Sequence, residues 1–223
     1  MAASSTALRA RRRALSRSRR WTRAGIVSLL GGVAALGVGL VFAGSPGTLA
    51  DGTRIFHPGW YRKAERALKT AQRRVSRRKK GSARRKKAVT LLAKAHQQVR
   101  RQRADFHHKT ALTLVRATDV IYHEDLQTAN LVKNHYLAKS ISDAGWSAFL
   151  TILVFKAEYA GKRVVAVPPA YTSQICSGCG VVVSKGLSVR WHSCPNCGTS
   201  LHRNHNAAKN IERAGQALRG TMA

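Results

Sequence analysis

Apolar residues recur at spacings of three and four over residues 60–115, a period that predicts helices. The basic run RRKKGSARRKK at 77–87 interrupts this stripe with a Gly-Ser pair, which is typical of a turn. We therefore expect a helical hairpin over residues 60–116. Its apolar stripe is formed by Ala64, Leu68, Ala71, Val75, Leu92, Ala95, Val99 and Phe106.

Two short β-branched runs predict strands after this hairpin. The first, VIY at 120–122, has Glu124 at its carboxyl end, and the second, KRVVAVPP at 162–169, is stopped by prolines. A mostly buried helix is expected over residues 144–161 and a last helix over 206–218. Strands that alternate with helices favour an α/β core. The last helix should turn inward the side chains of Ala207, Ile211, Ala214 and Leu218.

The segment before the hairpin has a different pattern. Residues 25–50 carry no charge, and 25–43 are apolar or small without interruption, after the sequence SRRWTR. This resembles a secretory or twin-arginine signal, or a single membrane span. The segment at 25–48 could instead hold the first buried strands of a domain, or sequence displaced by a frame disruption or a wrong start. Residues 1–24 are rich in Ala, Ser and Arg and lack acids, which favours a disordered basic tail.

Charge points to a class of partner. The chain has 223 residues, with 40 Lys and Arg against 9 Asp and Glu, a formal net charge of +31. Such a field attracts polyanions, so nucleic acid is the first expected partner and an anionic membrane surface the second. Like charges along the hairpin cost helix stability, and a phosphate backbone would offset that cost. The hairpin residues that we expect to bind nucleic acid are Arg73, Arg74, Arg77, Arg78, Lys79, Lys80, Arg84, Arg85, Lys86 and Lys87.

All four cysteines fall in two C-x2-C pairs near the end of the sequence. Thiolates two residues apart can both face one metal, and two such pairs complete a tetrahedron with Zn–S distances of about 2.3 Å. Two disulfides are the alternative, but the glycine after each pair, Gly180 and Gly198, suits the tight turn of a zinc knuckle. A structural zinc site indicates a reducing compartment, hence the cytoplasm. The expected ligands are Cys176, Cys179, Cys194 and Cys197.

Several motifs in order resemble the transposon-encoded TnpB (OrfB) proteins, which are relatives of type V CRISPR effectors. They include IYHEDLQTANL and the residues that follow it to CSGCG at 121–180, then 186–198, and RNHNAAKNI at 203–211. The likeness spans roughly residues 49–215. It implies an α/β fold with a RuvC-like (RNase H-type) core over 49–170, an inserted four-cysteine zinc ribbon over 171–200 and a last motif helix over 201–223.

The resemblance also implies an activity, since members are RNA-guided DNA endonucleases carried by insertion sequences. DNA and a guide RNA are then the expected partners, and we expect neither a small-molecule substrate nor a membrane. Members cut with Mg²⁺ held by three carboxylates: an Asp on the first strand, a Glu in an EDL motif and an Asp in an RDxNAA motif. Paired Mg²⁺ ions need this clustered negative charge.

This sequence departs from that carboxylate pattern at two positions of three. Glu124, in HEDL, takes the second role, while Asn204 stands where the family shows the third acid. The first acid is expected near Leu40, in a strand reading roughly VGxDxG, but LGVGLVFAGSPG stands there and no acid precedes Asp51. Asn204 can offer a carbonyl oxygen but not the charge. We therefore expect a chain that does not cut DNA, with Mg²⁺ binding in doubt.

The zinc ribbon should stand beside the nuclease groove and present Lys185, Arg190, Trp191 and His192 to nucleic acid. Alternatively, Trp191 packs over the metal site. For the whole chain we expect an inactive, nucleoid-associated TnpB-type protein in the cytoplasm. The alternatives are a nuclease-dead repressor directed by a guide RNA, an active RNA-guided endonuclease, and a basic protein exported or anchored through the apolar segment.

Overall fold

A computed structural model describes residues 38–41, 47–186 and 188–220, which lie within one compact unit, Ala35–Ala223. The expected basic tail at 1–24 and most of the apolar segment fall outside the described residues. The end of that segment contributes two strands, β1 (Val38–Val41) and β2 (Gly47–Leu49). No helix in the described ranges has the length and apolar character needed to cross a bilayer.

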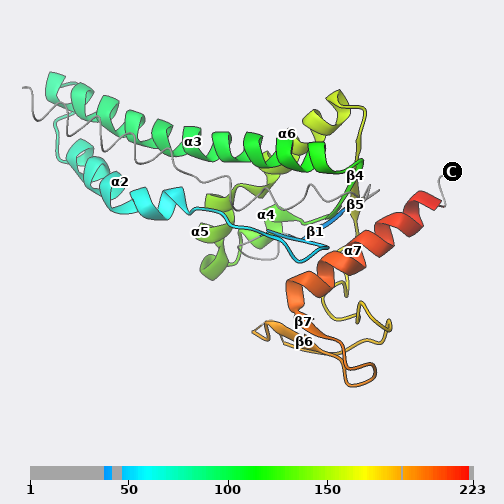
Figure 1. Ribbon diagram of the computed structural model, residues 1–223. Coiled ribbons are helices and arrows are strands. Elements are labelled where there is room, and N and C mark those ends of the chain that lie inside the picture. The colour runs from blue at the N-terminus through cyan, green and yellow to red at the C-terminus, as the bar shows by residue number, and fades with distance from the viewer. Residues whose placement is uncertain (1–37, 42–46, 187, 221–223) are drawn as a thin grey trace, which may run out of the picture. The chain divides into compact units, whose positions relative to one another are not determined.

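The core is a five-stranded sheet in the order β3-β2-β1-β4-β5 (Figure 1). β1, β2 and β3 pair antiparallel, whereas β1 with β4 and β4 with β5 pair parallel. β4 is buried along its whole length, as its apolar run predicts. Both predicted strands are confirmed, and a first strand is present in the centre of the sheet. The remaining strands are β3 (Arg54–Ile55), β4 (Val120–Glu124) and β5 (Arg163–Val167).

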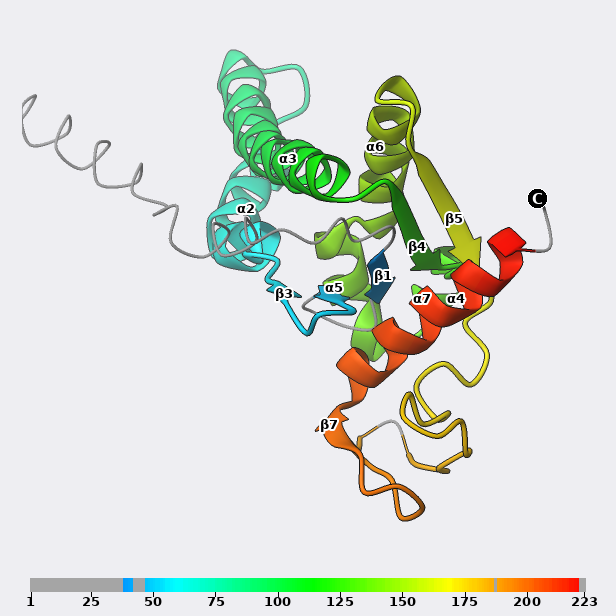
Figure 2. The ribbon, with the colours of Figure 1, turned by 45° about the vertical axis from the view of Figure 1, so that its right-hand side comes forward.

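Helix α7 (Arg203–Gly220) covers one face of the sheet (Figure 2). It approaches so closely that a Cβ on Gly39 of β1 would overlap the carbonyl of Ala208, and one on Gly215 would overlap the ring of Tyr122. The helix begins three residues before the predicted start, because the Nδ1 atom of His202 accepts the N–H of Asn204 at 3.2 Å and so caps its first turn. Of the predicted inward residues, Ala207 and Ile211 are buried, Ala214 is partly buried and Leu218 is exposed.

The other face of the sheet is covered by α3 (Ala83–Ala117) and α6 (Trp146–Tyr159) (Figure 2). α6 is less buried than its apolar sequence predicts: Phe155 and Tyr159 are 69% and 90% exposed. The buried residues of α6 form a stripe at spacings of three and four, and Leu150 and Ile152 are partly buried against the same core. That stripe consists of Trp146, Phe149, Leu153 and Ala157.

The predicted hairpin is confirmed as α2 (Trp60–Ser76) packed against the first half of α3 (Figure 1). Ser82 ends the turn, because its Oγ accepts the N–H of Arg85 at 3.2 Å and caps α3. At the other end of α2, the carboxylate of Asp143 accepts the N–H groups of Tyr61 and Arg62 at 3.0 and 3.3 Å. A residue about 80 positions away thus supplies the cap that Gly59 cannot.

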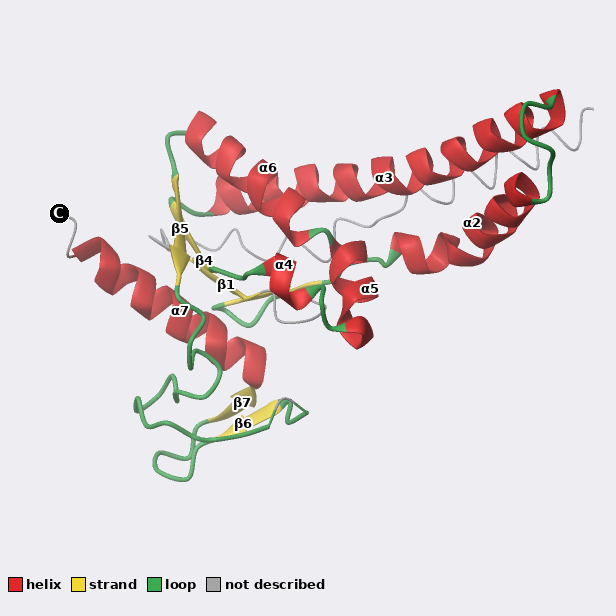
Figure 3. Cartoon of the chain, turned by 180° about the vertical axis from the view of Figure 1, so that it is seen from behind, coloured by secondary structure: helices red, strands yellow, loops and turns green. Residues whose placement is uncertain are grey.

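Two kinds of element were not predicted. Two short helices, α4 (Thr128–Leu131) and α5 (His135–Ala144), connect β4 to α6. A separate two-stranded sheet of β6 (Trp191–Ser193) and β7 (Ser200–His202) lies in the cysteine-containing segment. Figure 3 shows that the rest of this segment is mostly loop, next to the start of α7. These elements are too short for a hydrophobic period to reveal.

Candidate functional site

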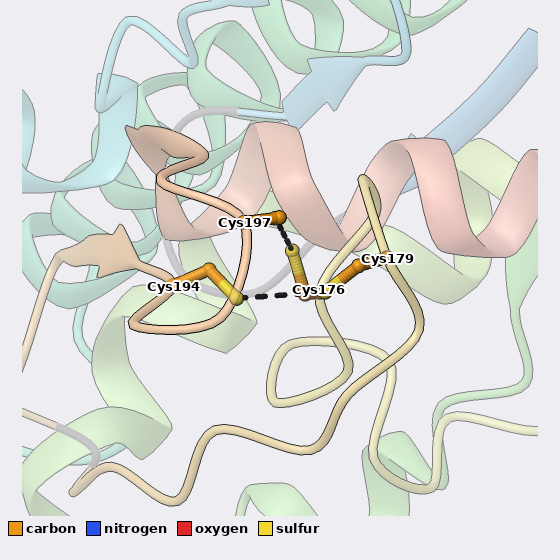
Figure 4. A group of neighbouring side chains, drawn as sticks. All are labelled: Cys176, Cys179, Cys194 and Cys197. Atoms are coloured by element: carbon orange, nitrogen blue, oxygen red, sulfur yellow. Dashed lines mark hydrogen bonds between the residues drawn. The ribbon is translucent and has the colours of Figure 1, made fainter.

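The four cysteines come together in one cluster, with all their Sγ atoms within 4.8 Å of one another (Figure 4). The Cys176–Cys197 and Cys179–Cys194 Sγ pairs are each 3.6 Å apart. A disulfide would need about 2.05 Å. A zinc tetrahedron with Zn–S bonds of about 2.3 Å has edges of about 3.8 Å. The sulfurs therefore fit one metal ion and not two disulfides.

Each knuckle is shaped by its own backbone. The N–H of Gly180 donates to the carbonyl of Cys176 at 2.9 Å, and the N–H of Gly198 donates to that of Cys194 at 3.0 Å. Both glycines have left-handed backbone angles, with φ of 81° and 72°. A residue with a Cβ would be strained there. The predicted glycine turns are confirmed.

The thiols differ in acidity. Although burial acts to raise it, the pKa of Cys176 is lowered to about 5 by the backbone N–H of Cys179 and the side chain of His192. Although the backbone N–H of Cys197 acts to lower it, burial and the sulfur of Cys179 raise the pKa of Cys194 to about 11. Four ionised sulfurs this close repel one another, so a cation must lie among them before all four become thiolates.

The ribbon surface differs from the expectation at one residue. His192 is fully buried, so the prediction that it faces nucleic acid was wrong. Its Nδ1 contacts the ammonium of Lys185, which is itself partly buried, and burial lowers the pKa of that lysine. Arg190 is exposed, and Trp191 is 55% exposed. The indole N–H of Trp191 donates to Ser200 at 2.7 Å, so its ring is held against the β6–β7 pair.

The second candidate site surrounds Glu124 at the carboxyl end of β4. Glu124 is 5% exposed, and its Oε1 accepts the hydroxyl of Thr172 at 3.4 Å. Asn204 lies in the first turn of α7 and is also 5% exposed. No local pattern pointed to Thr172, which lies in the loop between the prolines after β5 and the first knuckle.

The strand register locates the first expected carboxylate. β1 and β4 are parallel with Leu40 opposite His123, so the next position brings residue 41 beside Glu124. Position 41 is also where VGxD would carry its Asp, because Val38 and Gly39 match the first two letters. The prediction near Leu40 is thus moved by one residue, and position 41 holds valine. Within the described ranges, only the cysteines form a group of three or more Cys, His, Asp or Glu placed to share a metal.

The basic residues of the hairpin line its turn and the adjoining helix ends. Nine of the ten are exposed. Arg85 is the exception, because its guanidinium Nη1 donates to the carbonyls of Val75 and Arg78 at 2.9 and 3.1 Å. It therefore closes the hairpin turn, which leaves the other nine as the cationic surface.

Two family profiles match this chain. Residues 47–135 match the family described as "Probable transposase" (OrfB_IS605), and residues 146–211 match "Cas12f1-like, TNB domain". The chain belongs to the TnpB (OrfB) family. The TnpB resemblance expected from the motifs is therefore confirmed.

Curated TnpB relatives and a solved structure agree with this assignment. A "Putative RNA-guided DNA endonuclease" of Streptomyces pristinaespiralis is 41% identical over 172 residues, covering 76% of this chain and 42% of the relative. "Putative RNA-guided DNA endonuclease InsQ" of Escherichia coli (strain K12) is 32% identical over 188 residues, covering 77% and 46%. The chain thus spans less than half of each relative.

The solved structure is a cryo-EM Cas12f1–sgRNA–target DNA complex, matched with a TM-score of 0.57 at 14% identity. The match covers 82% of this chain and 51% of the Cas12f1 chain. It shows a shared fold. The predicted α/β, RuvC-like fold class with a four-cysteine cluster is confirmed.

Proposed function

We propose that this chain is a TnpB-type nucleic-acid-binding protein that has kept the RuvC-like fold and a zinc-binding ribbon but does not cut DNA. The observation that carries the proposal is the set of residues at the three expected carboxylate positions, of which Glu124 stands at the carboxyl end of β4. This set keeps one carboxylate, Glu124, while position 41 is valine and position 204 is asparagine.

The chemistry of phosphodiester cleavage explains why this loss matters. Two Mg²⁺ ions close together repel each other, and they stabilise the attacking and leaving oxygens only if carboxylates compensate their charge. Asn204 could donate a carbonyl oxygen to a metal, but it brings no negative charge. One buried acid cannot balance two divalent ions, so the site at Glu124 would hold neither the metal pair nor the activated water.

Binding of nucleic acid is supported by the charge that remains. The net charge of +31 and the nine exposed cations around the hairpin turn form a surface suited to a phosphate backbone. Arg190 and the half-exposed Trp191 add a cation and an aromatic ring on the ribbon. The relatives carry the name "Putative RNA-guided DNA endonuclease", which favours DNA and a guide RNA as the polyanions.

A cleavage assay tests the inactive part of the proposal. The purified chain is incubated with RNA transcribed from sequence flanking its gene, matching target DNA, and Mg²⁺ or Mn²⁺. We expect intact DNA at all times. DNA cleavage that Glu124→Ala abolishes would overturn the proposal, and would instead establish the active endonuclease.

A salt titration tests the binding part. Each phosphate contact releases counterions, so the affinity for duplex DNA should fall about 10³-fold or more between roughly 50 and 200 mM salt if six or more phosphates are bound. Replacing Lys79, Lys80, Lys86 and Lys87 with Ala should lower the slope of log K against log salt by about 3 to 4. A matched control replaces four exposed residues outside this surface: Gln72, Gln97, Gln98 and Gln102. An unchanged slope in the lysine variant would contradict this role for the hairpin.

A guide-RNA-directed repressor is the second candidate, because loss of catalytic acids with a retained cationic surface suits it equally. It predicts that affinity for a matching DNA target rises when the flanking RNA is present. Equal affinity for matching and unrelated DNA, with and without RNA, would remove this candidate and leave sequence-independent binding.

A further inference from the structure

Three polar side chains on one side of α7 hold the backbone around Cys176, and the two asparagines among them are buried. Asn206 accepts the N–H of Ser177 at 2.8 Å through Oδ1 and donates to the carbonyl of Ile175 at 2.7 Å through Nδ2. One turn on, Asn210 donates to the same Ile175 carbonyl at 2.7 Å. Arg213 donates to the carbonyl of Ser177 at 2.7 Å. The peptide groups on both sides of Cys176 are therefore fixed by side chains of α7.

Burial makes these bonds costly to lose. Asn206 is fully buried and Asn210 is 8% exposed, and a buried amide that loses its partners has no water to replace them. Cys176 is likewise fully buried, whereas Cys179 and Cys197 are exposed. The three α7 side chains therefore act as a clamp on the backbone of one of the two buried ligands, the other being Cys194.

Further hydrogen bonds link these residues to Glu124. Asn210 also donates to the carbonyl of Thr172 at 2.8 Å, and the hydroxyl of Thr172 donates to Glu124 at 3.4 Å. The loop from Thr172 to Ser177 therefore joins the first knuckle to Glu124, and α7 holds it at both ends. Because α7 also packs on β1 and β4, the loop cannot shift without disturbing the sheet contact.

We propose that Asn206, Asn210 and Arg213 are positioning residues for the metal held by the cysteines. Metal binding is then linked to the packing of α7, and of the loop from Thr172 to Ser177, beside Glu124. A bound metal holds Cys176 and Cys179 in place, and so also holds the Ile175 carbonyl, which accepts hydrogen bonds from the two asparagine amides of α7. In return, a seated α7 presents Cys176 in its ligating direction. Partners outside the ligand shell commonly change metal affinity in this way. The proposal rests on the metal-binding part of the proposed function and not on nucleic-acid binding.

The first experiment measures Zn²⁺ affinity by competition with a chromogenic chelator. Asn206→Ala should weaken Zn²⁺ binding about 10- to 100-fold. Asn206→Asp, which keeps an acceptor for Ser177, should weaken it less. Lys209→Ala, on the exposed side of the same helix, should leave the affinity unchanged.

A second control separates positioning from stability. Leu153 is fully buried in α6, across the sheet from α7, so Leu153→Ala lowers the melting temperature without touching the clamp. We expect this variant to keep wild-type Zn²⁺ affinity. An equal loss of affinity in Leu153→Ala and Asn206→Ala, or wild-type affinity in Asn206→Ala, would overturn the proposal.

The third measurement uses the unmodified chain and so does not depend on any variant folding. Hydrogen–deuterium exchange is compared with Zn²⁺ bound and after chelation. Removal of the metal should speed exchange in residues 203–211, 172–177 and 120–124, and leave the part of α3 at 95–110 unchanged. Faster exchange confined to 176–200 would overturn the linkage. A salt titration of DNA binding on the same samples reports separately on the proposed function.

Discussion

The two candidate sites of this chain differ in how many of their expected ligand residues are present. The cysteine cluster keeps all four ligands, both glycine turns and a clamp from α7. The site at Glu124 has the bond to Thr172, and we propose that it has lost two of the three carboxylates. A structural metal contributes directly to folding, so losing a cysteine harms the fold at once. Grouped catalytic acids repel each other and cost stability, so the fold tolerates or gains from their loss.

The largest effect should come from removing one cysteine ligand. Cys176→Ser should lower Zn²⁺ affinity by more than about 100-fold, because loss of an outer-shell partner alone costs about 10- to 100-fold. The melting temperature with Zn²⁺ should fall to that of the chelated protein. Ser184→Ala, an exposed ribbon substitution, is the control and should change neither quantity. Stoichiometric Zn²⁺ in Cys176→Ser would mean that the cluster is not a four-ligand site.

A smaller effect on stability should follow from placing aspartates at positions 41 and 204. The double variant Val41→Asp with Asn204→Asp should place three carboxylates together, and we expect it to lose about 2–4 kcal/mol of stability in the Zn²⁺-loaded protein before Mn²⁺ is added. Mn²⁺ at about 100 times its Kd should return about 2.7 kcal/mol through binding to the folded state.

Thermal melts with and without Mn²⁺, after Zn²⁺ loading, measure both effects. The single variant Asn204→Asp is the matched control and should respond weakly to Mn²⁺. A double variant that is as stable as the Zn²⁺-loaded parent without Mn²⁺ would show that positions 41, 124 and 204 do not converge.

The smallest effect should come from neutralising the remaining acid. Glu124→Gln keeps an oxygen for the Thr172 hydroxyl and is nearly the same size, so stability should change by less than about 1 kcal/mol. DNA affinity should stay the same. If Mn²⁺ raises the melting temperature of the parent chain and Glu124→Gln abolishes that rise, the site at Glu124 still binds metal. The two candidate sites then do not differ in metal binding.

Local patterns revealed most of the fold. The hairpin at 60–116 followed from a long apolar stripe with a Gly-Ser break, and the cysteine cluster from spacing within one segment. β1 was ambiguous, because a short strand inside an uncharged segment looks like part of a signal. The partial exposure of α6 was missed, because an apolar helix gives no sign of which side lacks a partner.

Contacts between distant residues were beyond the sequence. Asp143 caps α2 from more than 80 residues away, and Asn206 meets Ser177 across 29 residues. The asparagines at 206 and 210 lie one turn apart, on a helix whose neighbouring apolar positions are buried. That spacing is a signal of a buried polar stripe, but only the fold shows what the stripe binds.

The close contact of α7 with β1 also constrains how the protein is made. Gly39 of β1 allows this contact and Gly215 of α7 allows a second one with Tyr122 of β4, and the two glycines are separated by most of the chain. The cover that α7 gives to one face of the sheet is therefore missing until residues 203–220 have left the ribosome. During that interval a highly cationic nascent chain exposes apolar strands next to ribosomal RNA, so we expect its folding yield to depend on chaperones more than that of proteins whose core closes early.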